Sequence, residues 1–572
     1  MISSVLVPAK IFREYSKYIR LGFLLFFGIV GVVFRFYGLS HMPLLNRELV
    51  DANLGVMIVN GDMSSTNYLG VGSPITLFFH VILFWLTGSS SVVIVRFVSA
   101  LFGSVLMFVP FMFERYVGRI VSYIMFSFIA VAPSAVMISR IADGSAIGFF
   151  GWNLALLGLA RLFKEKQISG QLLLVYGLMI GVLSGRYLLV GGLIFIVFCY
   201  LSSQIELRQF SDYGLSLSSF NIIGLVIVTV IVCTKFLVYK QGMMSLGNVL
   251  IEWISGWGYV VEGKYWYSFI LTAFRFQIPL ILALLGGIWF RSPFDRIDKV
   301  IFGFMLMQLI YACVYGAISG SYMILLVIPL FVLIARMIST ICEECIIKES
   351  VYVIGVQIIL LFSLIIFGVI VFGDRLFLDV LLQSQTNNQV LVSLALLIGM
   401  LAMVVVLFGV GWSWSNSLSA FAITFTVVGV FYSMHVSSRF RRFPVDNILQ
   451  SFVSYPSNQI LVDTLGDISL RVVGIDNEVD IHILGDQHRL RLDWMLRDFK
   501  NITWSHDSDA RGASVVIADG KNFVFGVDEP YVGHDFQLYN DNYSSNFVVA
   551  SSSKDIVTVW VKEKLIKGSD NY

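Results

Sequence analysis

The sequence predicts a polytopic α-helical membrane protein that ends in a small α/β domain. Of its 572 residues, 57% are hydrophobic and only 13% are charged, and the mean hydropathy is +0.82. These values lie far outside the range of soluble proteins. After residue 440 the composition changes, and short β-branched segments replace the long apolar ones.

Apolar segments long enough to cross a bilayer recur along the first three quarters of the chain. A hydrocarbon core of about 30 Å needs roughly 17 or more such residues. The candidate spans lie near 21–38, 92–113, 119–138, 146–163, 220–240, 266–290, 299–317, 321–338, 351–373, 388–410 and 417–435. The stretch 171–201 is too long for one crossing, so it predicts two short helices broken at Ser184-Gly185-Arg186. In total the sequence predicts about 13 transmembrane helices.

Basic residues predict the orientation of these helices. Four of them, Lys10, Arg13, Lys17 and Arg20, precede the first span, and basic clusters stay cytoplasmic. That span is too long for a signal-peptide core, so it is a retained helix. The predicted N-terminus is therefore cytoplasmic, in a multi-pass protein of the plasma membrane.

One apolar piece, "PITLFFHVILFWLTG" (74–88), is too short to span the bilayer. The main basic clusters fall on one side of the membrane only if this piece lies flat within the outer leaflet. The loops 39–91, 139–145, 241–265 and 374–387 then face outside.

The last part of the chain predicts a separate fold. Residues 1–438 form the predicted membrane domain, and residues 439–572 form an extracytoplasmic α/β domain. Its segments "EVDIHILGD", "NITWSHD", "ASVVIADG" and "DIVTVWVKEK" are typical of strands, including 479–485 and 513–518, with helical apolar spacing between them.

Charge and cysteine content exclude other classes. The formal net charge is +2, so bulk charge does not predict a nucleic-acid partner. The five cysteines all precede residue 350 and do not form a disulfide framework. Cys342 and Cys345 form a C-x-x-C without a second pair or a nearby histidine, so a metal or redox site is not predicted there.

The residues that could take part in catalysis or binding lie in the predicted outer loops. The residues are Arg47, Glu48 and Asp51 in the first loop, Arg140 and Asp143 in the second, Arg186 at the helix break, and Glu262 and Lys264 in the third. A carboxylate can deprotonate an acceptor hydroxyl or hold a divalent metal, and arginines bind phosphate bidentately. The set suits sugar transfer from a lipid-linked phosphate donor. Plainer interpretations stay open: Glu48 as rim polarity on an interfacial helix, and Arg140 as an interface anchor.

Several motifs in residues 20–200 resemble one enzyme family. A Pro-initiated apolar helix, "GSPITLFFHVILFWLTG", follows the first loop, and "RFVSALFGSVL" and "SRIADGSAIGFF" come after it in order. In this the chain resembles the polytopic GT-C glycosyltransferases, which include protein O-mannosyltransferases, aminoarabinose transferases and the catalytic subunit of oligosaccharyltransferase. The resemblance is strongest to a flippase-activity-associated, mannosyltransferase-like branch, whose C-terminal "W-Y-L-R-D-[FY]-P-N-V" run is similar to "DWMLRDFKNITW" (493–504) here.

The first loop departs from the pattern of that branch. In the frame "D-E-A-V-H-A", the segment "RELVDA" has Arg47 at the usual aspartate, keeps Glu48 and has Asp51 in place of the histidine. Ser73 stands where a basic residue often precedes the proline. The resemblance implies that the aspartate serves as catalytic base or metal ligand. Either Glu48 or Asp51 has taken over that role, or transfer activity is lost.

The resemblance and the loop residues together predict a membrane glycosyltransferase. It would transfer a sugar from a polyprenyl-phosphate donor to a glycan, lipid or protein acceptor outside the cytoplasm, in contact with membrane lipids. Glu48 and Asp51 would be catalytic, and Arg140 and Arg186 would bind the donor phosphate. Arg47, Asp143, Glu262 and Lys264 are accessory candidates, and a divalent metal is a candidate cofactor. The alternatives are a non-catalytic lipid-binding or assembly subunit and, third, a transporter.

Overall fold

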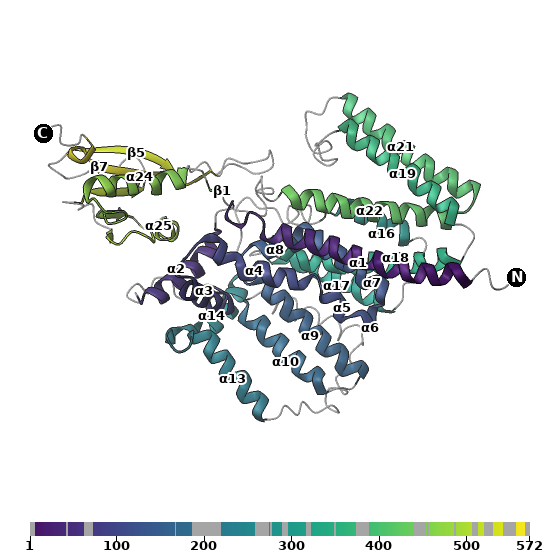
Figure 1. Cartoon of the computed structure of the whole chain (residues 1–572), viewed down its shortest axis with the longest axis horizontal. Helices are drawn as coiled ribbons and strands as arrows, with labels where there is room; N and C mark the ends of the chain where they lie inside the picture. Colours follow the sequence, from purple (N-terminus) through teal and green to yellow (C-terminus); the bar gives the residue numbers. More distant parts are fainter. Residues whose placement is uncertain are drawn as a thin grey trace.

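The structure is a computed structural model of a helical membrane protein with a small C-terminal sheet domain (Figure 1). It describes residues 6–41, 44–61, 72–165, 168–185, 219–257, 274, 277–288, 296–315, 322–347, 351–372, 388–439, 453–454, 457–485, 488–505, 513–519, 530–540 and 556–566. The predicted fold class is confirmed.

The helical part follows the predicted apolar segments. Its first half contains α1 (Leu6–Phe36), η1 (Leu39–His41), α2 (Asn46–Asn60), α3 (Pro74–Thr87), α4 (Val92–Leu106), α5 (Val109–Met112), α6 (Glu114–Val117), α7 (Arg119–Val131), α8 (Pro133–Arg140), α9 (Ser145–Glu165) and α10 (Ile168–Leu183). Its second half contains α13 (Ser219–Thr234), η3 (Lys240–Met243), α14 (Met244–Ser255), α16 (Ile278–Ile288), α17 (Arg296–Val314), α18 (Met323–Ile347), α19 (Val351–Phe372), α21 (Asn388–Gly411) and α22 (Trp414–Arg439).

Helix length bears on the predicted number of crossings. Within the described residues, five helices are long and apolar enough to span a membrane, or six if the bent pair α7 and α8 counts as one span. The total of about 13 stays a prediction. Helix α3 has 14 residues, which is about 21 Å at 1.5 Å per residue. That length is consistent with the predicted non-spanning helix at 74–88.

The segment 119–138, predicted as one span, is bent by 56° between α7 and α8. Pro133 begins α8 and has no N–H, so the carbonyl of Ile129 loses its helical donor. The fully buried Arg35 of α1 replaces that donor: its Nη2 donates to Ile129 O at 2.8 Å, and its Nη1 donates to Ala130 O at 3.0 Å. Helix α1 therefore stabilises the bend.

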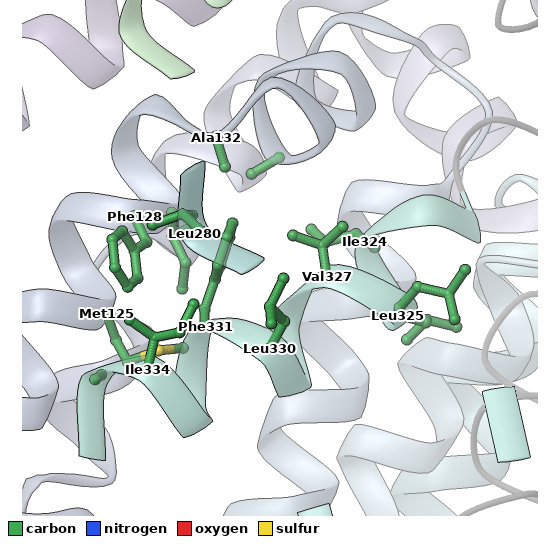
Figure 2. Close-up of a cluster of buried hydrophobic side chains, with 14 of the residues drawn as sticks. Met125, Phe128, Ala132, Leu280, Ile324, Leu325, Val327, Leu330, Phe331 and Ile334 are labelled. Atoms are coloured by element: carbon green, nitrogen blue, oxygen red, sulfur yellow. The ribbon is translucent and has the colours of Figure 1, made fainter. Parts of the chain in front are cut away.

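The main hydrophobic core lies where α7, α16 and α18 meet. Phe128 of α7 packs against Phe331 of α18 with ring centroids 5.0 Å apart, and Leu280 of α16 lies beside them (Figure 2). These side chains are 2% exposed or less, so the helices are fixed to one another by close packing of apolar groups.

The C-terminal domain contains β1 (Val453–Ser454), α24 (Ser457–Val472), β2 (Ile481–Leu484), α25 (Arg489–Met495), β3 (Ile502–Ser505), β4 (Val515–Asp519), β5 (Tyr531–Gln537), β6 (Tyr539–Asn540), β7 (Ile556–Lys562) and α26 (Glu563–Ile566). In the described residues its larger sheet has the order β3-β2-β4-β7-β5. Strands β3, β2 and β4 are parallel, and β7 is antiparallel to both β4 and β5. The predicted strands at 479–485 and 513–518 coincide with the neighbours β2 and β4.

The C-terminal domain is attached to the helical part through α25. Trp494 of α25 is 7% exposed and packs in a cluster with Leu49 and Ala52 of α2 and with Phe84 of α3. The side-chain amide of Asn53 also donates to Leu490 O at 2.7 Å. Helix α2, which carries both candidate carboxylates, is thus packed on one side by α3 and on another by α25 (Figure 1).

Candidate active site

Helix α2 begins at Asn46, and Glu48 lies in its first turn. A carboxylate is favourable there because it interacts with the N–H groups that have no partner within the helix. Its Oε2 accepts from Leu45 N and from Arg96 Nη2, both at 2.7 Å. Its Oε1 accepts from Arg96 Nε at 2.9 Å and from Ala142 N at 2.7 Å. Four N–H groups therefore saturate a fully buried carboxylate. Glu48 joins α2, α4 and the segment between α8 and α9.

Asp51 lies one turn further along α2 and is 3% exposed. Its Oδ2 accepts from the backbone N–H of Ser73 at 3.1 Å. Gly72 precedes this contact, and a Cβ there would lie 1.6 Å from Asp51 Oδ1. The absence of a side chain at residue 72 thus leaves room for the Asp51 carboxylate.

Ser73 connects this carboxylate to the end of α10. As the N-cap of α3 it accepts from Thr76 N, and its own hydroxyl donates to Leu183 O at 3.3 Å. Pro74 occupies the first helical position of α3, where its missing N–H costs nothing. The start of α3 is therefore fixed between Asp51 and the last turn of α10.

The loop before α9 meets the same junction. Asp143 Oδ1 accepts from Ser145 N at 3.0 Å, at the start of α9. Gly144 has φ +82°, and a Cβ there would lie 2.3 Å from Ser184 O and 2.6 Å from Ser73 Oγ. Three segments that are far apart in sequence, at 72–74, 142–145 and 183–185, are therefore in contact beside Asp51.

Arg140 lies at the end of α8 and is 5% exposed. Its Nη1 donates to Phe34 O and to Tyr37 O, both at 2.8 Å, and its Nη2 donates to Gly38 O at 2.9 Å. These are carbonyls at the C-terminal end of α1, which lack intrahelical donors. Only Nε has no partner among the described residues. The contacts are those of a helix cap, and phosphate binding by Arg140 stays a prediction.

The other predicted site residues are more widely placed. Arg47 is exposed on α2. Arg186, Glu262 and Lys264 lie outside the described residues. The structure thus brings Glu48, Asp51 and the loop that contains Asp143 together. Arg96 of α4 joins them as the partner of Glu48.

Lys235 is a member of this junction that the sequence analysis missed. It directly follows α13, is 1% exposed and donates from Nζ to Cys233 O at 2.9 Å. Cys233 packs with Ile75, Ile147 and Leu183, which lie beside the three segments described above. The only sequence signal is a lysine inside the predicted span 220–240.

The described part of the chain does not bring together the side chains that a divalent metal would need. Among the described residues, no group of three or more His, Cys, Asp or Glu side chains comes together. Both oxygens of Glu48 already accept two N–H groups each, and Mg²⁺ and Ca²⁺ prefer several oxygen ligands. The arrangement instead offers one carboxylate at Asp51 and one buried ammonium at Lys235. Together these can accept a proton and bind an anion.

Comparisons with known proteins show which solved structures have a similar fold. No family model matches the sequence, and no curated protein matches it. The structure is similar to crystal structures of ArnT from Cupriavidus metallidurans. The form bound to undecaprenyl phosphate has a TM-score of 0.54 and 12% identity, covering 95% of this chain and 99% of that one. The apo form has a TM-score of 0.51 and 12% identity, covering 87% and 93%.

The archaeal oligosaccharyltransferase AglB from Archaeoglobus fulgidus, in complex with an inhibitory peptide and a dolichol-phosphate, has a TM-score of 0.42 and 11% identity, covering 88% of this chain and 70% of that one. The likeness to ArnT, an aminoarabinose transferase, extends over nearly the full length of both chains. The chain therefore has the fold of the GT-C membrane glycosyltransferases.

Proposed function

We propose that this protein is a membrane glycosyltransferase that moves a sugar from a polyprenyl-phosphate donor to an acceptor outside the cytoplasm. The observation that carries the proposal is the buried Asp51 carboxylate, at a junction of four chain segments within a GT-C fold. Asp51 lies one helical turn from Glu48, whose two oxygens already accept four N–H groups, so Asp51 is the carboxylate proposed to take a proton.

In the proposed reaction, Asp51 accepts the proton of an acceptor hydroxyl. The acceptor oxygen forms a bond to the anomeric carbon of the donor sugar. The bond between that carbon and the phosphate oxygen breaks, and its electron pair leaves with the polyprenyl phosphate. A general base of this kind typically contributes about 10²–10⁴ in rate. No step requires a metal.

The other residues have supporting roles in this proposal. The Glu48–Arg96 pair positions α2, and with it Asp51, against α4. Arg140 fixes the end of α1 beside them. Arg186 follows Gly185 directly and is proposed, on sequence grounds, as a ligand of the donor phosphate. The distribution of basic residues supports a cytoplasmic N-terminus and an extracytoplasmic C-terminal domain.

The contact between α25 and α2 supports a role for the C-terminal domain in this reaction. Because α25 packs on the helix that carries Asp51, the domain is well placed to hold that helix in position and to border the acceptor side of the site. A glycan, a lipid or a protein segment are the candidate acceptors.

A release assay tests the proposal. The wild-type protein, in liposomes with a membrane extract as acceptor, should release polyprenyl phosphate from a panel of labelled polyprenyl-phosphate sugars, beginning with mannose, glucose and aminoarabinose. The Asp51→Asn variant should not. If no donor in the panel reacts but polyprenyl phosphate still binds, the proposal is wrong. The second candidate, a non-catalytic lipid-binding subunit, would then take its place, and the exposed Arg47 at the position of the usual aspartate favours it.

A further inference from the structure

We propose that Lys235 binds a phosphate group at the Asp51 junction and is the charge partner of the lipid-linked donor there. This inference rests on the proposed function for the identity of the lipid. The binding itself is independent of it, because it follows from the surroundings of one buried cation.

The Lys235 ammonium has more hydrogen-bond donors than the one acceptor that the described residues give it. An ammonium has three N–H donors, and burying it without partners is unfavourable. Lys235 is 1% exposed, and in the described part of the chain its hydrogen bond to Cys233 O is the contact that its Nζ makes with an acceptor. The ring of Tyr239 lies further away, 5.8 Å from Nζ to its centroid. A phosphate has several acceptor oxygens, which can accept from the remaining N–H groups of the ammonium.

A turn of left-handed backbone conformation holds Lys235 in its buried position. Lys235, Phe236 and Leu237 have φ of 50°, 58° and 69°, a left-handed conformation that side chains other than glycine rarely adopt. The turn is closed by hydrogen bonds from Phe236 N to Ile231 O and from Tyr239 N to Thr234 O. It leaves Phe236 and Leu237 60% and 64% exposed and buries Lys235. Such conformations persist where the surrounding structure holds them, often at ligand sites.

Lys235 also lies close to the junction around Asp51. Cys233 packs against Ile75 of α3 and Leu183 of α10, and the carbonyl of Leu183 is the one that Ser73 binds. Ser73 in turn donates its backbone N–H to Asp51. A phosphate on Lys235 would therefore lie near the carboxylate that accepts the acceptor's proton. The leaving group and the base would be close together, as the transfer reaction requires.

A plainer role for Lys235 is to cap the C-terminal end of α13, where cations are favourable. The two roles predict different effects of Lys235→Met. A cap contributes to the fold, so its loss lowers the melting temperature. A buried cation whose phosphate ligand is absent destabilises the fold. Replacing it by the apolar methionine should therefore leave the melting temperature of the ligand-free protein unchanged or raise it.

The test uses the full-length protein, purified in a non-ionic detergent without phosphate. The probes are farnesyl phosphate, the neutral farnesol, and inorganic phosphate as a competitor, and the readouts are affinity by calorimetry and melting temperature. Lys240→Met is the matched control, because Lys240 is exposed and lies five residues further along the same connection. Lys235→Met should weaken farnesyl phosphate binding at least about tenfold. Lys240→Met should not, and the affinity for farnesol should be equal in all three proteins.

Inorganic phosphate should displace farnesyl phosphate from the wild type if the headgroup alone is recognised. If it does not displace it but Lys235→Met still loses farnesyl phosphate, the lipid form is the ligand. The inference is wrong if Lys235→Met binds farnesyl phosphate as the wild type does. It is also wrong if that variant melts earlier and loses farnesol as well. Asp51→Asn should retain farnesyl phosphate binding. If the wild-type protein binds farnesyl phosphate but transfers no sugar from the labelled donors, that result contradicts the proposed function and not this inference.

Discussion

Arg96 of α4 binds the Glu48 carboxylate of α2 through two hydrogen bonds, 2.9 Å from Nε to Oε1 and 2.7 Å from Nη2 to Oε2. Their side chains are 3% and 0% exposed. The pair joins the helix that carries Asp51 to its neighbour, and the third nitrogen of Arg96 reaches Leu39 O at 3.1 Å, just after α1. Glu48 and Asp51, one helical turn apart, thus have different partners.

The first prediction follows from this pair. Glu48→Ala leaves a guanidinium buried without its carboxylate, which typically costs about 3–5 kcal/mol. The melting temperature in detergent should fall markedly. The double variant Glu48→Met/Arg96→Met should be more stable than Glu48→Ala, because it removes both charges together. A Glu48→Ala protein that melts with the wild type would show that the pair contributes nothing to the fold.

The second prediction concerns Gly72. A Cβ at this residue would lie 1.6 Å from Asp51 Oδ1, so Gly72→Ala must displace the carboxylate. Because the carboxylate is the end of a flexible side chain, the fold should tolerate this change. Sugar transfer should fall by up to about 10²-fold, since a misplacement of about 1 Å is enough for such a loss. Gly224→Ala, where the added group meets open space, is the control. Unchanged transfer in Gly72→Ala would contradict the role of Asp51.

The third prediction distinguishes two roles of Arg140. If it caps α1, Arg140→Ala should lower the stability by about 1.5–3 kcal/mol, because carbonyls bound by a charged donor lose their partner. The affinity for farnesyl phosphate should stay close to that of the wild type. Calorimetry and thermal unfolding on the same sample decide the matter. A weaker affinity at an unchanged melting temperature would instead support the phosphate-binding role that the sequence predicts.

The fourth prediction concerns the attachment of the C-terminal domain. Trp494→Ala removes the largest side chain of α25 from its cluster with α2 and α3, a change that typically costs about 3–5 kcal/mol in a packed core. Hydrogen exchange should become faster in α2 as well as in α25. Trp412→Ala, at a position 65% exposed directly after α21, should not change the exchange of α2. Equal protection of α2 in both variants would mean that α25 does not hold this helix.

Much of the fold is visible in the sequence because its physical causes are local. Long apolar runs predict the helices, and β-branched segments predict β2, β3, β4 and β7. The bend at Pro133 was not predicted, although a proline inside a helix removes a hydrogen bond. The number of crossings is less local, because it depends on segments of intermediate length such as α3.

The candidate site was predictable only in part. Loop positions and residue types mark Glu48 and Asp51, but which of the two is saturated depends on Arg96, 48 residues away from Glu48. Lys235 lies at the end of an apolar run, and nothing local distinguishes it from a lysine that reaches toward water. Its burial accompanies a left-handed turn and the packing of the neighbouring Cys233 against α3 and α10. These are long-range features that periodicity does not contain.

Asp51 is the proposed base of the sugar-transfer reaction, and the single-turnover rate of Asp51→Asn, measured beside its melting temperature, tests this role. The exposed carboxylate of Asp463 in α24 offers a matched control, Asp463→Asn. We predict that Asp51→Asn reduces the rate by about 10²–10⁴-fold while its melting temperature stays close to that of the wild type and of Asp463→Asn. Transfer by Asp51→Asn at the wild-type rate would contradict the account.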